Sequence, residues 1–199
     1  MYTSEYIHCS PLYISEANMV VIGANDGILY AFDGNSGSQM WSVATGDPIK
    51  SRAAYDPVGH QVIVGSFDKD IYAIDSRSGQ IKWRTSTRGS IYSEPLIAGN
   101  DIYLASTDKS LYILERETGT PKTRLDVGAK LYSSPALHLG RVYFASTAGM
   151  IYEYDPIQGQ LTGQSQLPER ITNKVAYGER SGLFFAATLD GKLFALRHL

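Results

Sequence analysis

The sequence predicts an all-β fold: a β-propeller of about five four-stranded antiparallel blades, the last of which lacks its outer strand. A short strand pattern occurs five times around an aromatic anchor, and successive anchors are 42, 40, 40 and 42 residues apart. Each anchor strand also follows another apolar run across a tight polar turn. A repeat of this size is one supersecondary unit that must stack on its neighbours to bury its apolar face. The anchors are Tyr30, Tyr72, Tyr112, Tyr152 and Phe194.

The innermost strand of each blade is expected at a short run that in four copies has a clear Pro or Ala near its middle. Proline cannot donate to a strand ladder, so it suits the edge of a sheet, and the innermost strand of a propeller blade is such an edge. The five runs cover residues 7–11, 49–53, 91–95, 131–135 and 171–175.

The second strand of each blade is expected at an apolar run rich in β-branched and aromatic residues. A turn such as Asn25-Asp26-Gly27 joins it to the anchor strand, and Asp-Gly turns supply the positive φ that short hairpins require. The five runs cover residues 20–23, 62–65, 102–105, 142–145 and 184–187.

A fourth strand follows the anchor in four of the repeats. A glycine stands seven residues after each of the first four anchors, and Trp41 and Trp83 stand four residues beyond the first two of these glycines. We interpret Trp41 and Trp83 as structural residues that dock one blade on the next. The chain is therefore expected to be one domain, 1–199, with repeats at about 5–45, 46–88, 89–127, 128–167 and 168–199.

Two arrangements of the blades fit the count. The ring closes with five blades, its last outer strand missing or supplied by residues 1–4, or the chain is a segment of a propeller of six to eight blades. We favour the closed ring, because an open arc would expose the apolar faces of two blades.

Two segments carry a family resemblance. Residues 31–41 and 73–83 follow the pattern small-x-acidic-x-x-Ser/Thr-Gly-x-x-x-Trp, and residues 113–123 keep its Glu115, Thr118 and Gly119 but lose the Trp. This pattern resembles the tryptophan-docking motif of the quinoprotein (pyrroloquinoline quinone-like) propeller repeats. The resemblance implies the propeller fold. Members of that superfamily include quinone-dependent dehydrogenases with bound calcium, an assembly factor for outer-membrane proteins and sensor domains beside kinases.

The dehydrogenases of that superfamily resemble this chain less well. They have eight blades and a disulfide between adjacent cysteines, whereas this chain has room for about five blades and a single cysteine, Cys9. Quinone-dependent dehydrogenase activity is therefore disfavoured. We expect no cofactor and no enzymatic activity.

Composition excludes other classes of function. The net charge of −2 gives no general attraction to nucleic acid. No apolar run reaches the roughly 18–20 residues of a membrane helix, so no membrane insertion is expected. The N-terminus as written carries no signal peptide, which predicts a cytoplasmic protein, or a periplasmic or secreted one if an N-terminal segment was removed.

The candidate binding residues lie on the expected innermost strands. They form two columns at a spacing of two residues, which places both columns on one side of each strand, near the central channel. The channel would be polar and net basic, able to hold a small anion or an acidic loop of a partner; alternatively these charges neutralise one another and line a wet channel. The candidates are His8, Lys50, Arg52, Tyr92, Glu94, Tyr132 and Lys174.

Other reactive side chains indicate no site. Aspartates recur in the hairpin turns, where turn chemistry explains them better than cation binding. Cys9 aligns with small serines and is expected to pack. The remaining histidines are expected in turns or at the terminus, without metal-ligand spacing. We therefore predict no catalytic residue and no metal ligand. The residues concerned are Asp26, Asp68, Asp108, Asp190, His60, His138 and His198.

The leading functional hypothesis is a non-catalytic propeller module, a scaffold that recognises a protein or peptide partner. One alternative is a propeller that binds a small ligand, or acts as an enzyme, through the polar channel residues. Another is a structural segment of a larger multidomain protein, fused to or associated with a larger enzyme or sensor.

Overall fold

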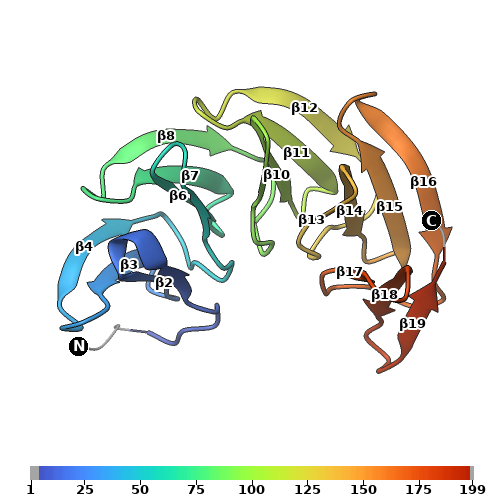
Figure 1. The fold of residues 1–199 in the computed structure, drawn as a ribbon, viewed down its shortest axis with the longest axis horizontal. Helices are drawn as coiled ribbons and strands as arrows, with labels where there is room; N and C mark the ends of the chain where they lie inside the picture. The colour runs from blue at the N-terminus through green and yellow to red at the C-terminus, as the bar shows by residue number, and fades with distance from the viewer. Residues whose placement is uncertain (1–4, 198–199) are drawn as a thin grey trace.

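Five antiparallel β-sheets stand side by side along an arc (Figure 1). The computed structural model describes residues 5–197. In this part of the chain four sheets have four strands and the fifth has three, in the order of the sequence. The all-β propeller fold and the missing outer strand of the last blade are thereby confirmed.

The strands of each sheet run in order from the concave edge of the arc to its outer edge. The first sheet contains β1 (Leu12–Ile14), β2 (Met19–Gly23), β3 (Ile28–Asp33) and β4 (Gln39–Ala44), with the 3-10 turn η1 (Ser15–Ala17) between β1 and β2. The second contains β5 (Ala54–Asp56), β6 (Gln61–Gly65), β7 (Asp70–Asp75) and β8 (Ile81–Ser86). The third contains β9 (Leu96–Ala98), β10 (Asp101–Ala105), β11 (Ser110–Glu115) and β12 (Pro121–Asp126). The fourth contains β13 (Ala136–His138), β14 (Arg141–Ala145), β15 (Met150–Asp155) and β16 (Gln160–Gln166), and the fifth β17 (Ala176–Gly178), β18 (Leu183–Ala187) and β19 (Leu193–Leu196).

The hydrophobic core is divided among the contacts between neighbouring sheets. Four clusters of buried side chains each combine residues of two successive sheets. In the second sheet both faces are covered, so every residue of β6 is buried. This continuous burial is typical of a strand between two apolar layers and explains the unbroken apolar runs of the sequence.

The expected closed ring is wrong, because the arc is open and its first and fifth sheets do not meet (Figure 1). In the first sheet burial alternates along β2, with every second residue only half-buried. One face of this sheet therefore lacks the neighbour that covers β6. The half-buried side chains include Tyr30 and Phe32, whose stacked rings lie 6.1 Å apart, so the aromatic residues of this face shield one another. Residues 1–4, one suggested source of the missing strand, lie outside the described residues.

The expected innermost strands are displaced. Residues 49–53, 91–95 and their equivalents form irregular crossovers between sheets, and the three-residue strands β1, β5, β9, β13 and β17 directly follow these segments. Each of the four crossovers that link two sheets is fixed by a buried aliphatic residue whose backbone N–H bonds the preceding blade, as Ile91 N does with Ser66 O at 3.2 Å. A Cβ on Gly65 would lie 2.1 Å from Ile91 Cγ2, so the glycine makes room for this side chain. The crossover thus satisfies its backbone through the previous blade rather than through a strand ladder.

The tryptophans lie between successive blades. Trp41 donates its indole N–H to Ser76 O of the second sheet at 2.9 Å. A Cβ on Gly79 would come within 2.8 Å of Trp41, and one on Gly119 within 2.3 Å of Trp83. Each indole therefore packs on the glycine of the next blade's outer turn, which also has a positive φ.

Candidate functional site

The crossovers carry the candidate residues along the concave edge of the arc. Ser51 and Ser93 each donate a side-chain hydrogen bond of 2.8 Å to a carbonyl of the second strand of their own blade. Cys9 holds the same place in the first blade and bonds Gly23 O through Sγ at 3.2 Å. Burial raises the pKa of the Cys9 thiol. Cys9 therefore has the same packing contact as the serines.

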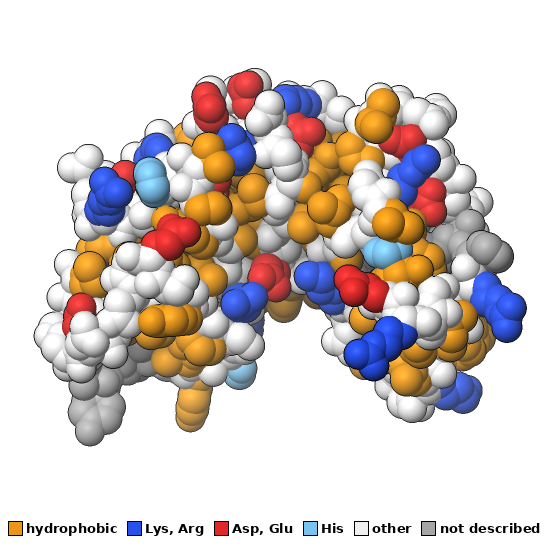
Figure 2. All heavy atoms as spheres, viewed as in Figure 1, with side chains coloured by type: hydrophobic (Ala, Val, Ile, Leu, Met, Phe, Trp, Pro, Cys, Tyr) orange, Lys and Arg blue, Asp and Glu red, His pale blue; other side chains and the backbone are white. Residues whose placement is uncertain are grey.

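Three candidates from three different blades line one cavity of about 300 Å³: Arg52, Glu94 and Lys174. Arg52 Nη1 lies 2.7 Å from Glu94 Oε1, and Arg52 Nε donates to Pro11 O at 3.4 Å. Ser134 Oγ accepts the backbone N–H of Glu94 at 2.9 Å and fixes its position. Figure 2 shows side chains of both charges along this concave edge. The arrangement presents charged groups above an apolar floor that includes Leu12, Ala54, Leu96 and Pro135.

The Arg52–Glu94 ion pair contributes little to folding. Its side chains are 40% and 28% exposed, so solvent screens their attraction. Exposed pairs of this kind stabilise proteins by about 0–1 kcal/mol. The pair can therefore be altered without unfolding the chain, and its groups are accessible to a molecule bound at the concave edge.

The other column forms a separate aromatic row. Lys50 Nζ lies 4.8 Å from the ring centroid of Phe67, Phe67 lies 4.3 Å from Tyr92, and Tyr92 lies 4.7 Å from Tyr132. Burial, with a smaller contribution from Tyr132, raises the pKa of Tyr92. Phe67 was not recognised in the sequence, although it is the one aromatic residue at its position in the five hairpin turns.

The seven candidates thus do not form one site. Arg52, Glu94 and Lys174 share a cavity, Lys50, Tyr92 and Tyr132 belong to the aromatic row, and His8 is exposed and joins neither set. The prediction of one channel wall assumed that side chains in these segments alternate as in a β-strand. The crossovers are not regular strands, so the side chains do not follow this alternation.

Three of the turn aspartates, Asp26, Asp68 and Asp108, accept a hydrogen bond from the anchor tyrosine of their own blade. Asp68 accepts hydrogen bonds from Tyr72 Oη at 2.6 Å, Gly46 N at 2.7 Å and Asp70 N at 2.9 Å. Burial opposes ionisation of Asp68, but these bonds outweigh it and lower the pKa of the carboxyl. For Tyr30 the direction is opposite: burial and the hydrogen bond to Asp26 both raise the pKa of its hydroxyl, to about 12. Within residues 5–197 no group of three or more His, Cys, Asp or Glu side chains is placed to hold a metal ion.

Among the described residues, no helix has the length and apolar character needed to cross a membrane.

Comparison with known proteins gives a family match and two structural matches. Residues 25–198 match the family described as outer membrane protein assembly factor BamB. The crystal structure of BamB from Moraxella catarrhalis superposes with a TM-score of 0.84 at 21% identity, over 98% of this chain and 62% of that one. The computationally designed Ika8 protein gives a TM-score of 0.82 at 17% identity, over 95% of this chain and 57% of that one. The chain thus spans about three fifths of the length of these structures, and no curated protein matches it.

Proposed function

The chain belongs to the family of the outer membrane protein assembly factor BamB, and from this premise we propose that it is a non-catalytic propeller scaffold that binds a protein partner along its concave edge. The family is described as an assembly factor, which indicates a role through protein contacts. The observation that carries the proposal for this chain is the cavity shared by Arg52, Glu94 and Lys174.

Three features of this cavity favour a polypeptide. Its charged groups come from the crossovers that lead into the second, third and fifth sheets, so several blades along the edge contribute to one cavity. Its floor is apolar, and interfaces combine an apolar centre with a polar rim. The partly exposed pair Arg52–Glu94 offers a donor and an acceptor to a partner's backbone or charged side chains.

Site-specific photocrosslinking in the cells that make the protein tests the proposal. A photoreactive residue is placed at Lys174, which is exposed and lines the cavity, and in a matched sample at Lys82, which is exposed on the outer strand β8. We expect one discrete protein adduct from position 174 and none from position 82. Equal adducts from both positions, or none from position 174, would contradict the proposal.

A charge exchange separates recognition from folding. The double variant Arg52→Glu/Glu94→Arg keeps an ion pair but exchanges its polarity, and the pair contributes only about 0–1 kcal/mol to stability. We therefore expect unchanged unfolding in urea together with a loss of the adduct from position 174. An adduct that persists in the double variant would show that the charges do not recognise the partner.

A further inference from the structure

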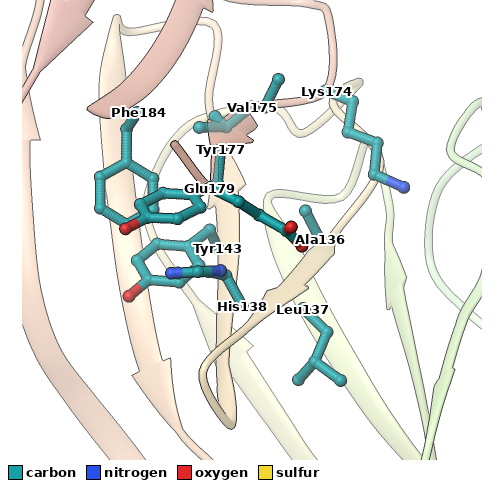
Figure 3. Close-up of a pocket in the computed structure, with 10 residues that line it drawn as sticks. Ala136, Leu137, His138, Tyr143, Lys174, Val175, Tyr177, Glu179 and Phe184 are labelled. Atoms are coloured by element: carbon teal, nitrogen blue, oxygen red, sulfur yellow. The ribbon is translucent and has the colours of Figure 1, made fainter. Parts of the chain in front are cut away.

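A second hollow lies between the fourth and fifth sheets; it shares Lys174 with the first cavity and contains neither Arg52 nor Glu94. Four rings line it: His138 at the end of β13, Tyr143 on β14, Tyr177 on β17 and Phe184 on β18 (Figure 3). The His138 and Tyr177 rings are stacked, with centroids 3.3 Å apart and an interplanar angle of 27°. Tyr143 and Tyr177 lie 4.5 and 4.9 Å from Phe184. The cavity measures about 300 Å³, and hydrophobic side chains gather around this junction (Figure 2).

His138 departs from the repeat. The last residues of the other innermost strands are Ile14, Asp56, Ala98 and Gly178. Asp56 has partners, since Gln61 Nε2 donates to it at 3.0 Å. His138 Nε2, in contrast, is buried and has no hydrogen-bond partner. A buried polar atom without a partner is costly, so a donor group that reached this nitrogen would supply a missing bond.

The mouth of the hollow has a further acceptor. Glu179 lines the cavity, is exposed, and forms no ion pair within the described residues. Glu153 lines the adjoining cavity, where it accepts bonds from Tyr143 Oη at 3.0 Å and Thr162 Oγ1 at 2.7 Å. Lys174 also lines this cavity, but its side chain extends away from the rings (Figure 3), and Arg197 lines the adjoining cavity.

We propose that this hollow binds the side chain of an arginine from a protein partner. A guanidinium group is planar, stacks on aromatic rings and carries five N–H donors. One donor would meet His138 Nε2, in the tautomer protonated on Nδ1, and others would meet the Glu179 carboxylate. A leucine of similar size would leave both acceptors without partners. The identity of the occupant as part of a protein rests on the proposed function, whereas the preference of the hollow for a guanidinium does not.

Titration with a small probe tests the preference without a partner. The probe is N-acetyl-arginine methylamide, followed through the NMR signals of the aromatic rings, and its matched controls are the citrulline and leucine analogues. Citrulline keeps the shape of arginine and lacks its charge. We expect saturable shifts of the His138 and Tyr177 signals with a dissociation constant on the order of 1 mM for arginine, and at least fivefold weaker binding of both controls.

Two variants and a control assign the binding to the named groups. Glu179→Gln and His138→Phe should each weaken arginine binding at least threefold, the first by removing the charge and the second by removing the acceptor while keeping a ring. Glu117→Gln, which changes an exposed glutamate in the turn between β11 and β12, should leave it unchanged. The same spectra report whether each variant is folded.

The proposal is overturned if leucine or citrulline binds as tightly as arginine, if arginine causes no saturable shift, or if Glu179→Gln has no effect. The titration uses a small probe and no partner, so failure of the arginine site and failure of the scaffold function can be told apart.

Discussion

Replacement of Asp68 by alanine should destabilise the second blade by about 2–4 kcal/mol. The carboxylate accepts three hydrogen bonds, and its loss leaves Tyr72 Oη, on a side chain only 2% exposed, without a partner. An unsatisfied buried donor costs about 1–3 kcal/mol. Gly46 N is exposed and can bond water, so it adds little, whereas the bond to Asp70 N is part-buried and contributes about 1 kcal/mol.

Urea unfolding followed by the fluorescence of Trp41 and Trp83 measures this change. Asp190→Ala is the matched control, because Asp190 holds the same turn position in the fifth blade, is exposed and bonds no tyrosine. It should cost less than about 1 kcal/mol. The double variant Asp68→Ala/Tyr72→Phe should lose about 1–2 kcal/mol less stability than the sum of the two single losses, since both single variants remove the same hydrogen bond.

The pH dependence follows from the lowered pKa of Asp68. A carboxyl whose pKa is lower in the folded state stabilises the fold above its unfolded pKa, near 3.9, and this stabilisation is lost as the pH falls through the folded value. The difference between the parent chain and Asp68→Ala should therefore be full at about pH 6 and decrease below about pH 4. A loss under 0.5 kcal/mol at pH 6, or a difference that does not decrease in acid, would refute the reasoning.

Three further predictions concern the repeat itself. Ala148→Asp supplies the acceptor that Tyr152 lacks in the fourth blade and should raise the free energy of unfolding by about 1 kcal/mol, measured in urea; a decrease would contradict the role given to the turn aspartates. Lys109 has a φ of 76°, so Lys109→Gly should relieve strain and stabilise by about 0.5 kcal/mol in thermal unfolding, and a lower midpoint would count against it. Ile91→Ala should cost about 2–5 kcal/mol in urea, because Ile91 is fully buried against Gly65; a cost under 1 kcal/mol would show that the crossover does not couple the blades.

The sequence was sufficient to predict the blades but not their closure. The spacing of the anchors and the hairpin turns repeats so regularly that five sheets follow from local patterns alone. Closure depends on the rotation from one sheet to the next, which no residue encodes by itself. An open arc does not leave the face of the first sheet fully exposed, because Tyr30 and Phe32 stack on each other and are half-buried without a neighbouring blade.

The candidate site was predicted in part. Arg52 and Glu94 stand out in the aligned crossovers, and the structure places their charges 2.7 Å apart. The division of the candidates into two sets could not be predicted, because the prediction treated the crossovers as β-strands with alternating side chains. The crossovers instead bond the previous blade. His138 was expected in a turn, yet it ends β13; its departure from the last residues of the equivalent strands was the signal that could have revealed the second hollow.

The buried crossover residues give the coupling between blades a direction. Ile91 belongs to the third repeat, yet its side chain lies against Gly65 and its backbone bonds Ser66 of the second. Each blade therefore completes the one before it, and a weakened crossover should expose its predecessor first. In native-state hydrogen exchange, Ile91→Ala should accelerate exchange in the second sheet more than in the fourth, so that local unfolding spreads toward the N-terminus.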